Sequence, residues 1–228
     1  MFPDDLKPSQ PYHHGDVKNA LIHAAMKLID TNELEAMSLR RLAKEVGVTP
    51  SAVYNHFADK DALMMAIKIR LYEDINRYFD SHYPESDDPE QTLLDMCYAY
   101  FHFSREFPSQ FHFIFSSTLP LEWSTPEFVK VSCYCLVKAR KAVSGIFEKY
   151  QVPCKEEDVV GTTLLVWSQL HGIVMLRNSG SIPAAVTYQE WPSVCGLQEN
   201  EEVEKLLREH VQMTVNAILS KQRNDSHH

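Results

Sequence analysis

The chain has 228 residues, of which 44% are hydrophobic and 11% aromatic, a composition that excludes a disordered protein and allows a substantial buried core. Its formal net charge is −9, but residues 1–70 hold nine Lys and Arg against nine Asp and Glu, whereas residues 71–228 hold 13 against 22. The five cysteines are an odd number and no signal segment opens the sequence, which argues against a secreted disulfide framework. We expect a cytoplasmic protein.

The N-terminal quarter predicts three short helices. Asp16 can cap a first helix, because apolar residues at helical spacing follow it to about residue 29. A second apolar stripe follows Ser38 and ends at Gly47, which can close a helix in the left-handed conformation. Thr49 can cap a third helix whose first turn takes Pro50. Two helices joined at a glycine in this way predict a helix-turn-helix, whose second helix enters the major groove of DNA.

The same stretch is locally basic on an acidic protein. Residues 38–60 carry a net charge of +2, so a polyanion would have one place to bind. Helical phase turns Val53 and Phe57 inward and leaves Ser51, Asn55 and, on the flank, Tyr54 for the groove, where base edges form hydrogen bonds. The alternative is an ordinary helical hairpin with a solvated charged face.

The rest of the chain also predicts helices. Asp59 can cap a long helix to about residue 82, after which two prolines and an acidic cluster interrupt the pattern. Further helices are expected at about residues 90–106, 109–117, 126–150, 156–178 and 200–222. The expected fold class is all-α, with a three-helix helix-turn-helix head in residues 12–58 and a larger helical body in residues 59–228.

Residues 158–177 are apolar on nearly every side. A membrane span is the alternative, but polar residues such as Thr162 and Gln169 interrupt the segment and flanking topology signals are missing. We interpret it as a buried helix that needs a second subunit on one face, with the amphipathic helix at 203–219 as its neighbour. The resulting homodimer would be joined by Val166, Leu170, Val174, Val211, Val215 and Ile218.

The segment "MSLRRLAKEVGVTPSAVYNHFADKDALMMAI" resembles the DNA-binding module of the TetR family of one-component transcriptional regulators. The resemblance rests on the spacing of Ala43 and Gly47, on Tyr54-x-His56-Phe57 and on the following Lys60. It implies that DNA is contacted at the positions of Arg40, Thr49, Pro50, Ser51, Tyr54, Asn55, His56 and Lys60, with Tyr54 and Lys60 typically on phosphates.

The body resembles one TetR subgroup through Trp167, His171 and Gly172, a Trp-His-Gly pattern on the penultimate helix. This resemblance implies a body that binds a small effector and dimerises through its last two helices. Aromatic residues crowd into positions 98–115 and can line an apolar pocket in which histidines orient a ligand. The candidate pocket residues are Tyr98, Phe101, His102, Phe111, Phe115, Trp123, Trp167 and His171. The alternative is that these rings form plain core.

Signatures of catalysis are missing. The sequence has no G-x-S-x-G, no H-E-x-x-H and no glycine-rich phosphate loop, and nothing completes a zinc site with Cys133 and Cys135, whose redox role stays open. We expect no enzymatic activity, no cofactor and no bound metal.

The sequence therefore favours a transcriptional repressor whose homodimer binds a palindromic double-stranded DNA operator, without a membrane partner. A small, largely apolar effector would release it. The alternatives are a DNA-bound scaffold that recruits a protein partner, or an activator.

Overall fold

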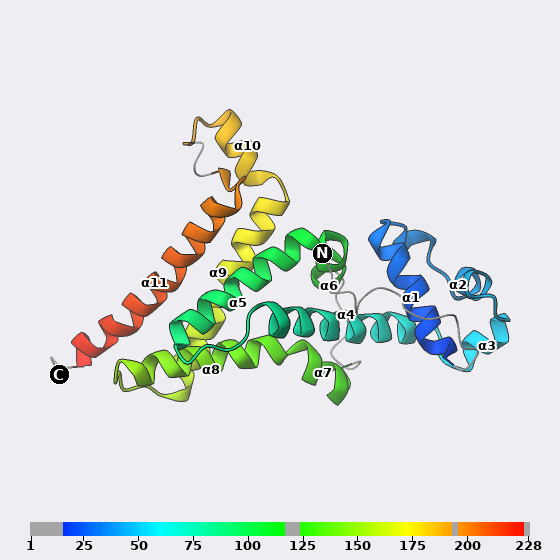
Figure 1. The fold of residues 1–228 in the computed structure, drawn as a ribbon, viewed down its shortest axis with the longest axis horizontal. Coiled ribbons are helices and arrows are strands. Elements are labelled where there is room, and N and C mark those ends of the chain that lie inside the picture. The colour runs from blue at the N-terminus through cyan, green and yellow to red at the C-terminus, as the bar shows by residue number, and fades with distance from the viewer. Residues whose placement is uncertain (1–15, 117–123, 193–195, 226–228) are drawn as a thin grey trace.

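The computed structural model describes residues 16–116, 124–192 and 196–225. Regular structure in these residues is entirely helical, which confirms the expected all-α class. The head and the long connecting helix comprise α1 (Val17–Asp30), η2 (Leu34–Ala36), α2 (Leu39–Val46), α3 (Pro50–Tyr54) and α4 (Lys60–His82). The body comprises α5 (Pro89–Glu106), α6 (Pro108–Ser116), α7 (Pro126–Ser132), α8 (Tyr134–Lys149), α9 (Glu156–Asn178), α10 (Ser181–Tyr188) and α11 (Asn200–Asp225) (Figure 1).

Local sequence signals start these helices where they were expected. Asp16, Ser38, Thr49 and Asp59 are N-caps, and each side chain accepts a hydrogen bond of 2.8 to 3.2 Å from the backbone N–H three residues on. Gly47 ends α2 with a φ of 77°, in the left-handed region that glycine adopts without strain. The predicted starts of these helices and the predicted end of α2 at Gly47 are therefore confirmed.

Two parts of the body differ from the expectation. The helix expected at 126–150 is two helices, α7 and α8, which meet at Cys133. The sequence does not predict helix α10, because its eight residues span little more than two turns and Pro183 resembles a helix breaker. Pro183 lies in the first turn of α10, where the missing N–H has no intrahelical partner to lose.

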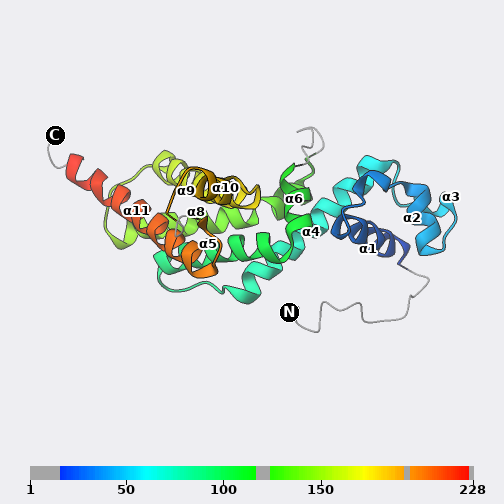
Figure 2. The ribbon, with the colours of Figure 1, turned by 90° about the horizontal axis from the view of Figure 1, so that it is seen from above.

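Buried side chains form two cores, one in the head and one in the body, and α4 contributes to both. Figure 2 shows α4 running from the head into the body. Leu63, Ile67 and Leu71 pack in the head core with α1, α2 and α3, whereas Ile75 and Phe79 pack in the body core. The first turns of α4 therefore complete the head, although the expected head ended at residue 58. Residues 12–15 of that expected head lie outside the described residues.

Helix α5 lies at the centre of the body, where it contacts α4, α6, α8, α9 and α11. The six residues expected at the dimer interface all belong to this core, with exposed fractions of 6% or less: Val166, Leu170, Val174, Val211, Val215 and Ile218. This corrects the expectation, because a side chain buried within its own subunit offers no surface to a second copy. Helix α9 is apolar on both faces, so its pattern could not show which face turns inward.

His210 of α11 is 5% exposed, and its Nε2 atom has no hydrogen-bond partner among the residues that the structure describes. Burial lowers the pKa of His210, although a hydrogen bond with the backbone of Val166 acts in the opposite direction. The folded-state pKa thus lies below the unfolded value of about 6.5, so stability is lost as the pH falls through that value. The unfolded chain takes up a proton that the buried ring does not accept.

We predict that the urea midpoint of unfolding falls between about pH 7.5 and about pH 5.5, and that His210→Leu shows a smaller fall. Burial also lowers the pKa of His102 and His171, which accounts for the part of the pH dependence that the variant keeps. The same pH dependence in both proteins would contradict a buried neutral His210.

Candidate nucleic-acid interface and aromatic cluster

The helix-turn-helix presents one polar face to solvent. All eight residues that the sequence assigned to DNA contacts are exposed: Arg40, Thr49, Pro50, Ser51, Tyr54, Asn55, His56 and Lys60. Val53 and Phe57 are 0% and 2% exposed and pack in the head core, as the helical phase predicted. Helix α3 is only five residues long and ends at Tyr54, so Asn55 is its C-cap.

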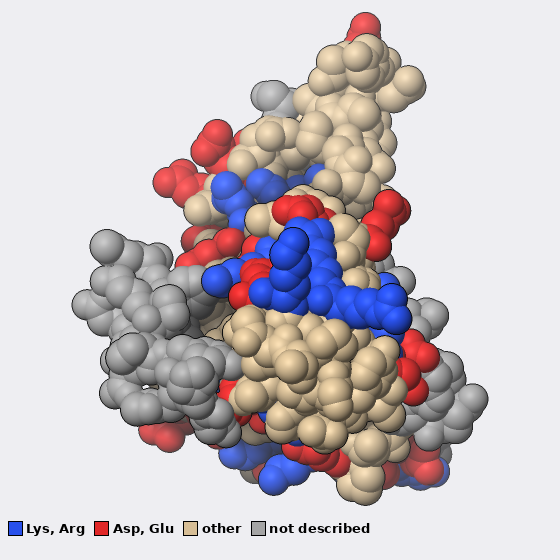
Figure 3. All heavy atoms as spheres, turned by 90° about the vertical axis from the view of Figure 1, so that its right-hand side faces the viewer, with Lys and Arg blue, Asp and Glu red and all other residues tan. Residues whose placement is uncertain are grey.

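Basic side chains gather beside this face. Figure 3 looks onto the end of the molecule that carries α2 and α3, and it shows Lys and Arg next to a surface of uncharged residues. Arg41 is held by Glu33 at 2.6 Å, and this hydrogen bond lowers the pKa of the Glu33 carboxyl. Within the described ranges, Arg40, Lys44 and Lys60 have no carboxylate within 4.0 Å, so their charges are available to phosphates.

A second group of residues meets in the body, where Tyr100, Phe111, Phe115, Trp167 and His171 come together from α5, α6 and α9. We call these five residues the aromatic cluster. Ring centroids of neighbours in the cluster lie 4.8 to 6.3 Å apart, and most pairs are tilted or edge-on, the favoured arrangements.

The cluster contains one polar pair. The hydroxyl oxygen of Tyr100 lies 2.6 Å from Nδ1 of His171, a contact between residues 71 positions apart. Burial lowers the pKa of His171 and raises the pKa of Tyr100, so both groups are neutral at neutral pH. The cluster is thus an apolar site with uncharged hydrogen-bonding groups, suited to an uncharged molecule rather than an ion.

The structure brings only part of the expected pocket together. Tyr98, Phe101 and His102 lie on other sides of α5, and Trp123 is outside the described residues. Arg208 of α11 donates to the Tyr98 hydroxyl at 2.7 Å, and Nε2 of His102 lies 3.7 Å from Glu204.

Phe101 is fully buried beneath two guanidinium groups. The residues expected from the sequence did not include Tyr100. Aromatic rings occupy nearly every position from 98 to 103, so helical spacing cannot indicate which of them face the pocket.

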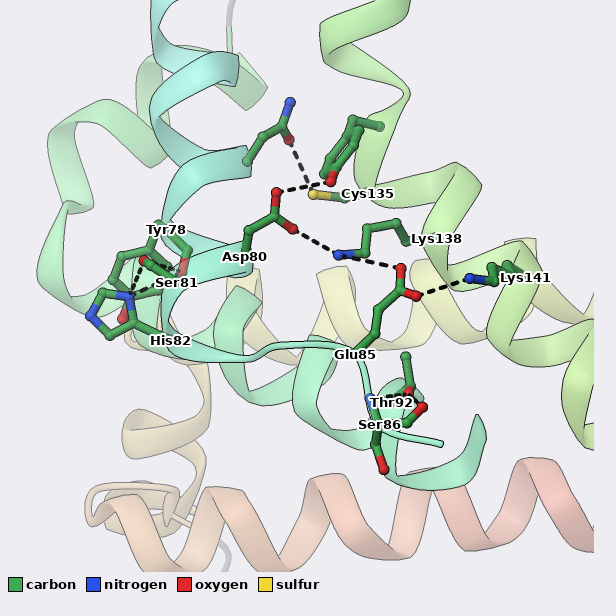
Figure 4. Close-up of polar contacts among 12 residues, drawn as sticks. Tyr78, Asp80, Ser81, His82, Glu85, Ser86, Thr92, Cys135, Lys138 and Lys141 are labelled. Carbon is green, nitrogen blue, oxygen red and sulfur yellow. Dashed lines mark hydrogen bonds and ion pairs between the residues drawn. The ribbon is translucent and has the colours of Figure 1, made fainter. Parts of the chain in front are cut away.

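Two surface hollows lie elsewhere, and neither is lined by the aromatic cluster. The larger, of about 1070 Å³, lies between the α4–α5 connection and α8, and the smaller, of about 380 Å³, lies between α9 and α11. Several charged groups at the larger one are paired. Lys138 lies 2.7 Å from Asp80 and 3.6 Å from Glu85, and Lys141 lies 2.9 Å from Glu85. Figure 4 shows these pairs. This hollow therefore does not resemble an apolar effector site.

The Cys135 thiol, beside α4, is poorly suited to reactive chemistry. The Cys135 thiol donates to the side-chain oxygen of Asn76 at 3.3 Å, and burial raises the pKa of Cys135 to about 12. A thiol with so high a pKa is a poor nucleophile. No group of three or more His, Cys, Asp and Glu side chains in the described part of the chain is arranged to hold a metal ion.

Comparisons with known proteins agree with this geometry. Residues 21–67 match the model for bacterial regulatory proteins of the tetR family, and residues 93–190 match the model for the tetracyclin repressor-like C-terminal domain. Together the two matches cover more than half of the chain, and the second one contains all five residues of the aromatic cluster.

Two curated relatives are HTH-type transcriptional regulators that are themselves uncharacterised. Rv0681 from Mycobacterium tuberculosis is 22% identical over 163 residues, which is 72% of this chain and 71% of that protein. YobS from Bacillus subtilis is 24% identical over 163 residues, which is 71% of this chain and 79% of that protein.

Solved structures share the fold. A protein of unknown function from Rhodococcus sp. RHA1 superposes with a TM-score of 0.65 at 19% identity and covers 92% of this chain and 96% of its own. RolR, solved in complex with the ligand resorcinol, gives a TM-score of 0.54 at 13% identity and covers 87% of each chain. With its helix-turn-helix head and helical body, the chain belongs to the TetR family and is a DNA-binding transcriptional regulator rather than an enzyme.

Proposed function

We propose that this regulator is a cytoplasmic repressor whose homodimer binds a palindromic double-stranded operator and leaves it when a small, largely apolar effector binds. The observation that carries the proposal is that one helix, α4, connects the DNA-facing part of the molecule with the part that holds the aromatic cluster. An exposed, locally basic face lies at the head, a neutral aromatic cluster lies in the body, and α4 contributes to both cores.

The DNA-contacting residues follow from the exposed face of the helix-turn-helix. Arg40, Ser51 and Asn55 would contact base edges, and Tyr54 and Lys60 would hold phosphates at its margins. Thr49, Pro50 and His56 complete the face. Two such heads in one dimer would place their recognition helices roughly 34–36 Å apart, one turn of the duplex.

Fragments selected from genomic DNA by the purified protein would test these roles. Lys60→Ala should weaken binding similarly on all sequences and lower the slope of log affinity against log salt by about 0.9, because one phosphate contact is lost. Arg40→Ala should relax preference at particular base pairs, each by about 1–3 kcal/mol. Lys205→Ala, an equal charge change on the exposed face of α11, is the control. Equal salt slopes for Lys60→Ala and Lys205→Ala would remove Lys60 from the phosphate contacts.

The dimer would form through the outward faces of α9 and α11. Leu165 and Leu176 of α9 are 64% and 52% exposed, and Met213 of α11 is 66% exposed beside the smaller hollow. Gly161 and Gly172 face open space on the same helix, so a partner helix could approach closely. By length and composition, helix α9 is long and apolar enough to cross a membrane, with a mean hydropathy of 1.5. In the proposed dimer, a second subunit rather than lipid would cover its exposed apolar face.

Charged substitutions on this face test the dimer without disturbing the core. Leu165→Glu and Met213→Glu should give a folded monomer in sedimentation velocity, because both side chains project into solvent in one subunit. Val174→Glu should instead unfold the chain, since Val174 is fully buried. Val129→Glu, on the exposed side of α7, should stay dimeric. A double variant, Leu165→Glu with Met213→Glu, that stays folded and dimeric would exclude this interface.

The effector would bind at the aromatic cluster, whose Trp167 is 40% exposed and open to an incoming ligand. The resorcinol complex of RolR shows that a protein with the same fold was solved with a small aromatic molecule bound. Helix α4 runs from beside α3, the proposed recognition helix, into the body, so a change in the body can alter the spacing of the two heads.

A panel of small uncharged aromatic compounds, resorcinol included, would test this mechanism by tryptophan fluorescence with and without a selected DNA fragment. A ligand that weakens DNA binding must bind the DNA complex more weakly by the same factor, with a coupling of about 1–3 kcal/mol. His171→Leu should weaken ligand binding, and Tyr98→Phe, on the α11 side of α5, should leave it unchanged. Equal affinity for the free and DNA-bound protein across the panel would favour the scaffold that recruits a protein partner.

A further inference from the structure

The head contains an ion pair that joins α2 to the connection before it. Glu33 lies between α1 and α2, and its Oε2 atom is 2.6 Å from a guanidinium nitrogen of Arg41 in α2. The other carboxylate oxygen accepts a hydrogen bond of 3.1 Å from the hydroxyl of Thr31, the residue that caps the end of α1. The bonds from Arg41 and Thr31 lower the pKa of Glu33, so its carboxylate is charged at neutral pH.

Arg41 lies where a helix-turn-helix meets the DNA backbone. Its backbone N–H donates to the Ser38 side chain at 3.2 Å, which places Arg41 in the first turn of α2. In this motif the first helix crosses the backbone of the duplex while the second helix enters the groove. Arg41 directly follows Arg40 of the exposed face, and its own side chain is 38% exposed. An arginine in this place is suited to a phosphate contact.

The pair with Glu33 sets Arg41 apart from the basic residues around it. Within the described ranges, Arg40, Lys44 and Lys60 have no carboxylate within 4.0 Å, whereas Arg41 already holds one. A phosphate that reaches Arg41 must share it with the carboxylate or displace it. Displacement exchanges one anion for another, and it leaves the charge of Glu33 unpaired beside a polyanion. A phosphate contact at Arg41 therefore adds little affinity while Glu33 is present.

We propose that Glu33 competes with the DNA backbone for Arg41 and so lowers the affinity of the head for duplexes of every sequence. The effect is independent of sequence, because phosphate contacts carry no information about the bases. It acts on the electrostatic part of DNA binding, which supplies essentially all of the affinity for non-specific sites. The proposal rests on the proposed function, in which the exposed face of the head contacts DNA.

The alternative role of the pair is a structural brace between the α1–α2 connection and α2. Exposed ion pairs stabilise proteins only weakly, so a brace of this kind would change the stability of the head little. The two roles predict effects of opposite sign on DNA binding. Removal of a competitor strengthens binding, whereas removal of a brace loosens α2 and weakens binding.

Salt titrations of DNA binding by the full-length protein test the proposal, with a fluorescent duplex of arbitrary sequence and anisotropy as the readout. Glu33→Gln should bind several-fold more tightly at low salt, and its slope of log affinity against log salt should steepen by about 0.9, because one more phosphate contact forms. Glutamine keeps the size of the side chain and an oxygen that can accept from Thr31.

A double-mutant cycle shows whether Arg41 carries the gain. The variant with both Glu33→Gln and Arg41→Gln should return to the wild-type slope, because the released guanidinium is no longer there. The matched control is Glu35→Gln, which removes the same charge from an exposed carboxylate two positions further on, in η2. Glu35→Gln should leave the slope unchanged, because Glu35 is in no ion pair within the described part of the chain.

Three results would overturn the proposal: weaker DNA binding by Glu33→Gln, an equal gain for Glu33→Gln and Glu35→Gln, or a gain that persists with Arg41→Gln. The Lys60→Ala variant, measured in the same titrations, tests the proposed DNA contacts separately. A lower slope for Lys60→Ala without a gain for Glu33→Gln would overturn the proposal alone. An unchanged slope for Lys60→Ala beside an Arg41-dependent gain would support the proposal and count against the proposed contact at Lys60.

Discussion

The arrangement of the molecule depends on one apolar stripe along α4. Leu63, Ile67, Leu71, Ile75 and Phe79 recur every four residues and are all 4% exposed or less. A helix of 23 residues is roughly 34 Å long, and residues four apart are rotated by about 40°, so the stripe winds around the helix along its length. The head core and the body core therefore meet α4 on different sides, and the position of α4 in the body sets the position of the head.

Helix α4 is held by strong apolar contacts and by weaker polar contacts. The apolar stripe supplies the burial that keeps the two cores attached, whereas the polar contacts of Asp80 and Glu85 with α8 are largely at the surface. Exposed ion pairs contribute about 0–1 kcal/mol each. The pairs of Asp80 and Glu85 with α8 therefore orient the end of α4 but hold it only weakly. In the proposed mechanism the head would shift between two positions, and these exposed pairs would oppose that shift only weakly.

Helix α9 is apolar for two different reasons on its two sides. Its inner face, with Val159, Val166 and Val174, packs in the core of its own subunit, and its outer face keeps Leu165 and Leu176 in solvent. In the proposed dimer that outer face would be buried against a second copy, whereas Trp167, on another side of α9, would remain part of the aromatic cluster. Helix α9 would then connect the dimer interface to the effector site. The effector site in turn lies next to α6, which contacts the head.

Short-range features were determined by the sequence alone. The caps at Ser38 and Thr49, the turn at Gly47 and the outward face of α3 each depend on residues within a few positions of one another, so local hydrogen bonding and helical phase decide them. The family could be recognised for the same reason, because its DNA-binding motif is a continuous segment that carries its own turn and its own small core.

Long-range pairings were decided only by the tertiary structure. Tyr100 meets His171 across 71 positions, Phe113 of the body packs in the head, and the valines of α9 turn inward rather than toward a partner. Helical periodicity says that a face is apolar, but it does not say which neighbour covers that face. When two faces of a helix are apolar, as in α6 and α9, the choice between them is made by the packing of the other helices, and that packing is not encoded in any local pattern.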